Sequence, residues 1–507
     1  MPESRQANTV AIPRRWPLVQ QFYTRSPNTP ITKDARLVNA YAEKDPADGE
    51  YWVFKRLGVS PLPYYSNPGF AAGQYTYTGT PGIPLQVLCV TGGYLYVNEL
   101  IVGAVPGSGL PGGYQTYFET VNSSPQTVVL MNIAWAGIYT PSTGSLVQIT
   151  DSTFAGLQLV PGWAYLDATL YVMDVYGSIW GTAGFNNAAV WAGLNVIPAS
   201  TKADQGVFLA TQLTYVIAFK QWTTQIFYDA ENPAPGSPLS PVPDAQIPFG
   251  CLFAASVQKI DEILLWVTSN QTISPQVILM ENLSPRIVST PSIDRLLDNV
   301  LAFGGIGVNP VYSWSLKHAG HRFYGLTLIG QNLTIVYDID QKLWYQWTDS
   351  SGNYWPFTNF AYTLPSGLAG QPIPGLHLAQ YIGGSLVGPV AGNSYVIDGD
   401  YEYPNDIGVL FPVDIYTPNF TGGTSRRKQL NMMYFDSDQT AGSLLNCRYS
   451  DDDYAHWTNF RTLDLNYERP YLDQEGTFTK RAYHFRHRCN TTFRIKASDL
   501  QLDLGTL

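Results

Sequence analysis

The sequence has 507 residues, of which 45% are hydrophobic and 13% are charged, and its formal net charge is −10. Such a low charged fraction, together with abundant aromatic residues, Gly and Pro, excludes a helical bundle, a coiled coil and an intrinsically disordered chain. The acidic net charge argues against a dedicated nucleic-acid binder, which is normally basic. It permits a channel wall along which DNA slides, because contacts between protein cations and phosphates supply most non-specific affinity and an acidic wall has few of them.

The first segment, residues 1–65, is polar, basic and punctuated by prolines. The stretches 13–17 and 26–30 contain two prolines each, and residues 36–41 alternate as a strand does. Prolines at this density disfavour a helix and favour extended backbone. We therefore expect an extended N-terminal arm that wraps a neighbour or is disordered.

Residues 66–425 consist of short apolar runs separated by turn residues. Each run has about 4–6 residues, is rich in β-branched or aromatic side chains and is bounded by Gly, Pro, Asn or Asp, which is typical of strands. Clear examples are 85–90, 127–130, 169–173, 214–219 and 262–267. The runs recur about every 40–50 residues, which predicts a β-propeller-like body of four-stranded blades, six to eight in number. Stacked sandwiches are the alternative.

One segment of this body departs from the strand pattern. Apolar residues at 293, 296, 297, 300 and 301 follow helical spacing, Ser292 is a candidate N-cap and Gly304 follows the last turn. These features predict one short amphipathic helix near 292–302. No apolar run is long enough to span a membrane, so we expect no membrane insertion.

The C-terminal segment, residues 426–507, is again basic and alternating, and we expect it to close or flank the body. Over 480–496, Tyr483, Phe485 and His487 share one face of the predicted strand, and the other face holds His484, Arg486 and Arg488. We expect contacts with acidic neighbours at the cations of this segment, which are Arg426, Arg427, Lys428, Arg486 and Arg488.

The sequence contains no recognisable catalytic motif. A nucleophile elbow, a phosphate-binding loop and a zinc-protease motif are all absent, so we expect no enzyme and no cofactor. The four cysteines are far apart and show no metal-ligand spacing, which predicts reduced thiols in the core.

An acidic run, Asp451–Asp453, lies in a frame that resembles the Asp-box turn of sialidase-like propellers. Ser450, Asp452 and Trp457 match that frame, whereas Tyr454 replaces its glycine. In such a turn the aspartate accepts hydrogen bonds from backbone N–H groups and is structural. A calcium site is the less favoured alternative.

Three motifs occur in the same order and at comparable spacing to those of one known family. They are VTGGYLY at 90–96 followed by VGAVPGSG at 102–109, then QVIL at 276–279 with SIDRLL at 292–297, and finally KR at 480–481 with FRI at 493–495. Together they resemble the packaged-DNA stabilisation proteins of short-tailed bacteriophages, also called the tail hub or nozzle. Asp294 replaces the usual Glu, and Leu57-Gly58-Val59 replaces a Pro-Gly turn.

The resemblance implies a structural virion protein of the viral tail, synthesised in the host cytoplasm. It implies a homohexameric ring below the portal and its adaptor protein, which continues the DNA channel and retains the packaged genome until ejection. Other implied partners are a needle, plug, spike or fibre protein, and double-stranded DNA that passes without sequence-specific binding.

Two other functions are open at this point. One is a carbohydrate-binding or glycan-cleaving propeller, of the tailspike or sialidase-like kind; residues 60–316 contain only 5 Lys and Arg against 14 Asp and Glu, which argues against an arginine cluster there. The other is a host-attachment module with aromatic loops at 64–65, 75–77 and 114–117, although such residues are more often sheet surface or subunit contacts.

Overall fold

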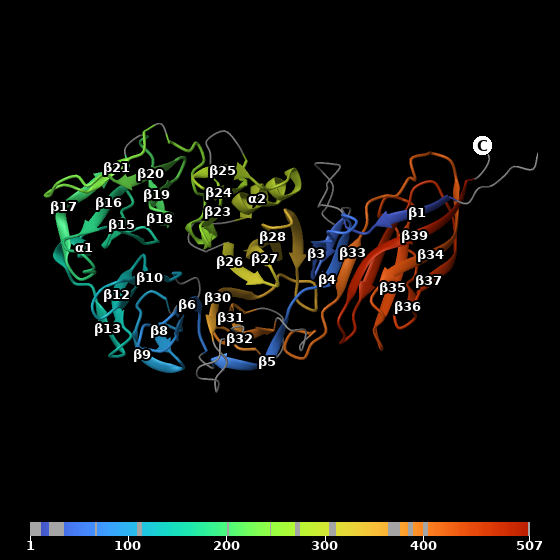
Figure 1. Ribbon diagram of the computed structural model, residues 1–507, viewed down its shortest axis with the longest axis horizontal. Coiled ribbons are helices and arrows are strands. Elements are labelled where there is room, and N and C mark those ends of the chain that lie inside the picture. Colours follow the sequence, from blue (N-terminus) through green and yellow to red (C-terminus); the bar gives the residue numbers. More distant parts are fainter. Residues whose placement is uncertain are drawn as a thin grey trace, which may run out of the picture. The chain divides into compact units, whose positions relative to one another are not determined.

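Short strands joined by tight turns make up most of the protein in the computed structural model, which is all-β as predicted (Figure 1). The structure describes residues 12–19, 35–65, 68–108, 114–199, 202–243, 245–268, 274–303, 311–363, 376–383, 389–398 and 404–504. The proline-containing stretch at 26–30 lies outside these residues. Two compact units are present: a sandwich unit (1–59, 334–353 and 399–507) and a propeller unit (60–333 and 354–398).

The propeller unit is built from small antiparallel sheets that follow one another along the chain. Five of these sheets have four strands that are consecutive in the chain. The first contains β6 (Ala71–Tyr77), β7 (Gln86–Thr91), β8 (Tyr94–Val97) and β9 (Leu100–Ala104), and the second contains β10 (Tyr117–Val121), β11 (Thr127–Asn132), β12 (Trp135–Thr140) and β13 (Ser145–Gln148). The third contains β14 (Ala164–Leu166), β15 (Thr169–Met173), β16 (Ser178–Thr182) and β17 (Trp191–Pro198), the fourth contains β18 (Gly206–Gln212), β19 (Tyr215–Lys220), β20 (Thr224–Asp229) and β21 (Leu239–Pro241), and the fifth contains β22 (Gln258–Ile260), β23 (Ile263–Val267), β24 (Val277–Glu281) and β25 (Ser284–Ile287). They are the blades that the spacing of apolar runs predicts.

The last blade is completed by a strand from the start of the unit. Its order is β30 (Phe357–Thr363), β31 (Leu376–Tyr381), β32 (Ser394–Asp398) and then β5 (Gly58–Tyr65), which precedes β6 in the chain. The inner strand β30 also contacts β6 of the first blade. The circle of blades is thus closed by pairing between segments that are distant in sequence, and each blade keeps only one short outer edge. The hairpin of β26 (Val311–His318) and β27 (His321–Leu328) lies between the β22–β25 blade and β30 in chain order.

Two-residue turns with positive φ at both positions explain many of the hairpins. They occur at Asn98-Glu99, Asp167-Ala168 and Asn282-Leu283, each between directly paired strands. This backbone geometry matches the right-handed twist of the flanking strands, and Asn and Asp tolerate it better than most residues. The middle strands β15 and β23 are buried at every position, because a blade has neighbouring blades on both faces.

Helices are few among the described residues. Besides the single-turn α1 (Ser152–Ala155) and the 3₁₀ turns η2 (Ala254–Ser256) and η3 (Ile329–Gln331), the structure contains α2 (Pro291–Phe303), which confirms the helix predicted near 292–302. It begins one residue before the predicted cap Ser292, because Pro291 is well suited to the first helical position.

The sandwich unit consists of two sheets. One has the order β3 (Ala40–Lys44), β4 (Tyr51–Lys55), β39 (Arg494–Leu504), β34 (Lys428–Ser437) and β37 (Tyr471–Phe478), and β1 (Ile12–Pro17) also pairs with β39. The other contains β28 (Leu333–Asp338), β29 (Leu343–Trp347), β2 (Arg36–Val38), β33 (Val413–Tyr416), β38 (Ala482–His487), β35 (Leu444–Ser450) and β36 (Arg461–Asp464). The described parts of the expected arm are 12–19 and 35–65. Strands β1 to β4 pair within this unit, and β5 completes the last blade of the propeller unit.

Aromatic side chains join the two sheets of the sandwich unit. The rings of Phe435 and Phe485 are 5.4 Å apart, and those of Trp16 and Tyr483 are 5.6 Å apart. Both contacts connect the β1–β39 sheet with the sheet that contains β38, so the core lies between the two sheets. The cysteines are free, and Cys447 is buried in this core.

Candidate interface on the sandwich unit

The basic run at 426–428 spans the end of the turn before β34 and the first residue of that strand. Arg426 and Arg427 are exposed, but Lys428 is buried, and its Nζ donates hydrogen bonds to the carbonyls of Thr424 (2.8 Å), Arg426 (2.8 Å) and Thr479 (2.9 Å). An ammonium group has three N–H donors, and all three are used inside the protein. Lys428 therefore holds the turn, and Arg426 and Arg427 are the cations of the run that a partner can reach.

The two predicted interface cations in 480–496, Arg486 and Arg488, also differ in their exposure. Arg486 is half-buried and forms a two-pronged pair with Asp414, at 2.7 Å from Nε and 3.1 Å from Nη2. His484 also contacts Asp414 through Nε2 at 2.7 Å. Burial opposes ionisation of Asp414, but the hydrogen bonds from His484 and Arg486 outweigh it and lower the pKa of that carboxyl. Arg488, just beyond β38, is exposed.

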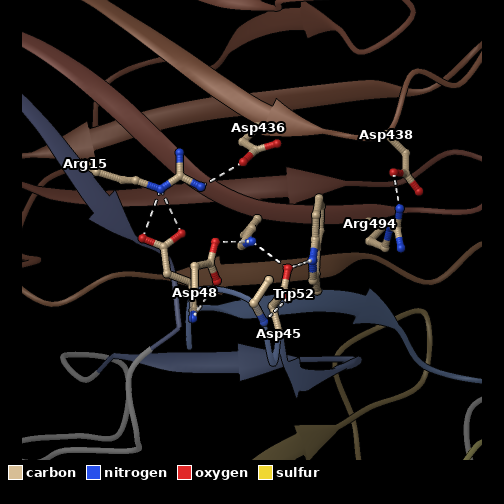
Figure 2. A network of polar contacts seen from close by, with 10 residues as sticks. Arg15, Asp45, Asp48, Trp52, Asp436, Asp438 and Arg494 are labelled. Atoms are coloured by element: carbon tan, nitrogen blue, oxygen red, sulfur yellow. Dashed lines mark hydrogen bonds and ion pairs between the residues drawn. The ribbon is translucent and has the colours of Figure 1, made fainter.

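An ionic network that the sequence analysis missed joins strands β1, β34 and β39 to the turn between β3 and β4 (Figure 2). Arg15 on β1 binds Glu50 at 2.8 Å and Asp436 at 2.8 Å, Lys496 on β39 binds Asp45 at 2.7 Å, and Arg494 binds Asp438 at 2.7 Å. The further carboxylates in contact are Asp48 with Lys496 and Asp499 with Arg15. Carboxylates outnumber cations, so this surface is acidic.

Hydrogen bonds lower the pKa of a carboxyl group in this network and so keep it ionised. The ammonium group of Lys496, the backbone N–H of Ala47 and the indole N–H of Trp52 lower the pKa of Asp45 to about 2. The Asp-rich turn at 45–50 is visible in the sequence, but Lys496 is about 450 residues away in the chain. No local pattern could have identified that partner.

The acidic run at 450–457 forms the Asp-box-like turn. Asp452 Oδ1 accepts hydrogen bonds from Ser450 Oγ (2.9 Å) and from the backbone N–H of His456 (2.9 Å), and Tyr454 takes the glycine position with a φ of 67°. Asp451 binds Arg481. These contacts are those of a structural turn. Within the described parts of the chain, no group of three or more His, Cys, Asp and Glu is arranged to hold a metal ion.

Comparison with known proteins identifies the family. The model of the family described as bacteriophage P22 Gp10, beta-propeller, matches residues 69–370. The chain belongs to this family. It is accordingly a phage tail or stabilisation protein with a β-propeller, and as such a component of the virion.

The match to the P22 Gp10 family covers most of the propeller unit and stops before the last part of the sandwich unit, at 399–507. The predicted interface cations therefore lie outside the matched residues. No match is found among curated proteins. None of the described helices is long and apolar enough to cross a membrane.

Solved structures with some likeness to the chain include two WD40 proteins and a designed protein. The WD40 repeats of RRP9 have a TM-score of 0.39 at 11% identity, with 68% of this chain and 98% of that chain covered. The Neurospora crassa Pan2 WD40 domain has a TM-score of 0.34 at 10% identity, with 72% and 90% covered. The designed Ika8 protein has a TM-score of 0.34 at 11% identity, with 66% and 99% covered.

Proposed function

We propose that this protein is the nozzle or tail-hub subunit of a short-tailed phage. Six copies form a ring below the portal and its adaptor, the ring continues the DNA channel, and with a needle or plug at its far end it retains the packaged genome until ejection. The role is mechanical, and no bond-breaking centre is part of it. The observation that carries the proposal is the family match over the propeller.

The charge distribution supports passage of DNA. Residues 60–316, which make up most of the propeller unit, contain 5 Lys and Arg against 14 Asp and Glu. Protein cations that neutralise phosphates supply most non-specific affinity for DNA. A wall with this charge repels DNA weakly instead of binding it, so a duplex can slide during packaging and ejection.

Exposed apolar side chains on the outer strands of several blades support assembly into a ring. Leu100 and Ile101 on β9, Val147 on β13 and Leu194 on β17 are exposed, with 73% of the surface accessible at Leu100 and 66% at Leu194. Strands β9 and β13 contact each other, and neighbouring exposed apolar side chains are typical of protein interaction sites. A subunit that packs against identical copies would cover such positions.

The oligomeric state tests the ring. Mass photometry and negative-stain images of the purified chain should show rings with about six times the chain mass of 56.1 kDa. A double variant, Leu100→Asp with Leu194→Asp, should give monomers, and the matched Leu100→Met with Leu194→Met should still form rings. A stable wild-type monomer that is also absent from the tail of assembled particles would refute the proposal.

Genome retention is tested on particles. Heads filled in the absence of this protein should lose their DNA to added nuclease, and adding back the wild-type chain should protect it. Heads that keep their DNA without the chain would contradict the retention role. Release of sugar from host polysaccharide by the purified chain would instead favour the glycan-cleaving alternative.

A further inference from the structure

A polar cavity lies among the inner strands of the propeller unit. Its volume is about 170 Å³, and its walls come from β6, β10, β26 and β30 and from the η2–β22 segment. The residues that line it include Gln74, Gln115, Thr116, Gln258, Ser313 and Asn359, and no charged residue is among the described residues of the wall. Aromatic rings, among them Phe118, complete it.

Buried polar atoms on residues of this wall have no hydrogen-bond partner among the described residues. Three of them are Oε1 of Gln74, Nε2 of Gln115 and Oγ1 of Thr116. Gln74 is 9% exposed and Thr116 is 5% exposed. Buried polar atoms are nearly always satisfied, so a cluster of them around one cavity indicates a site that hydrogen-bonds a guest.

Two other polar side chains of the wall form hydrogen bonds within the protein. Gln258 Nε2 donates to Ser313 Oγ at 2.9 Å, and Asn359 Nδ2 donates to Gln380 Oε1 at 2.8 Å. The three atoms named above are one acceptor (the Gln74 carbonyl), one donor (the Gln115 amide) and one hydroxyl that does both. A molecule with several hydroxyl groups matches this set, because each hydroxyl both donates and accepts.

The absence of charge in the described wall excludes ionic ligands. A carboxylate or an ammonium group would lose its hydration without gaining a counter-charge. A volume of 170 Å³ is about five to six times the share of one water molecule in the liquid, which suits a single sugar ring. We propose that this cavity binds a small, neutral, polyhydroxylated ligand of about the size of one hexose. The site does not depend on the role of the protein in the tail.

Ligand-observed NMR on the purified full chain tests the site, with glucose, galactose and N-acetylglucosamine as neutral probes and glucuronate as the charged probe. At least one neutral probe should bind saturably, whereas glucuronate should bind at least tenfold more weakly. Gln115→Leu should weaken binding of the neutral probe at least tenfold. The matched control is Gln225→Leu on β20, where a buried glutamine carbonyl is also unpartnered but lies outside the cavity wall, and it should bind as the wild type does.

Thr116 supplies a second, conservative test. Thr116→Val removes the hydroxyl at nearly constant volume and should weaken the same probe, whereas Thr116→Ser keeps the hydroxyl and should bind it normally. The proposal is overturned if no neutral probe binds, if Gln115→Leu and Gln225→Leu bind equally well, or if a crystal soaked with the probe shows only ordered water in the cavity. Glucuronate that binds as tightly as glucose also overturns it.

Discussion

Substitution of Arg56 by Met should strongly destabilise the sandwich unit. Arg56 and Asp406 have no exposed side-chain surface, and the guanidinium binds the carboxylate through Nη1 (2.9 Å) and Nη2 (2.5 Å). Nε also donates to Asn39 Oδ1 at 2.9 Å, Nη2 donates to the Thr348 carbonyl at 2.9 Å, and the group lies 3.7 Å above the ring of Phe411. One side chain thus joins the three chain segments of this unit.

The loss of stability can be estimated from the buried carboxylate that the substitution leaves behind. Arg56→Met leaves the Asp406 carboxylate buried without the cation that it hydrogen-bonds, which typically costs about 3–5 kcal/mol. For a unit of this size, each kcal/mol shifts Tm by roughly 2–4 °C, so we expect a fall of about 6–20 °C. Arg56→Met combined with Asp406→Leu should recover most of this loss, because an apolar pair of similar volume replaces a buried ion pair at little cost.

Thermal unfolding followed by circular dichroism and calorimetry measures these shifts. The control is Lys480→Met, which removes an exposed pair with Asp453 (3.6 Å) in the same unit and should change stability by less than about 1 kcal/mol. The reasoning is refuted if Arg56→Met melts within 2 °C of the wild type, or if the double variant is no more stable than Arg56→Met alone.

Three other predictions concern packing, pH and the interface. Gly325→Ala should cost about 1–3 kcal/mol in urea unfolding, because the added Cβ would lie 2.0 Å from the Trp314 ring; an unchanged midpoint would contradict this. Burial and the charge of Lys55 lower the pKa of His487 to about 3, so below pH 6.5 the unfolded chain binds more protons than the folded chain and the wild type loses stability. Between pH 7 and pH 5, His487→Gln should therefore lose about 2 kcal/mol less free energy of unfolding than the wild type. Equal losses in the two proteins would disprove this. Reversal of charge at Arg426 and Arg427 should impair tail assembly in a reconstitution assay while leaving Tm unchanged, and normal assembly would remove both residues from the interface.

The candidate interface shows where prediction from sequence succeeds and where it ends. The alternation at 483–487 is recovered in β38, with Phe485 facing the core and Arg486 bound to Asp414 on the other face. The five basic residues were equivalent in the sequence, but only Arg426, Arg427 and Arg488 are exposed. Whether a cation is reachable depends on carbonyls and carboxylates brought to it from elsewhere in the chain, such as the Thr479 carbonyl at Lys428.

The amino-acid pattern alone determined the local features of this protein. Apolar runs of strand length, the helix near 292–302 and the scarcity of cations in 60–316 depend on neighbouring residues only, and all were recognised in the sequence. The tertiary structure decided which distant segments pair: β5 completes the blade that contains β32, β1 adds to β39, and Arg56 meets Asp406. Pairings of this kind are selected by the free energy of the whole core and leave no periodic trace in the chain, which is why the cavity and the ionic network became visible only in three dimensions.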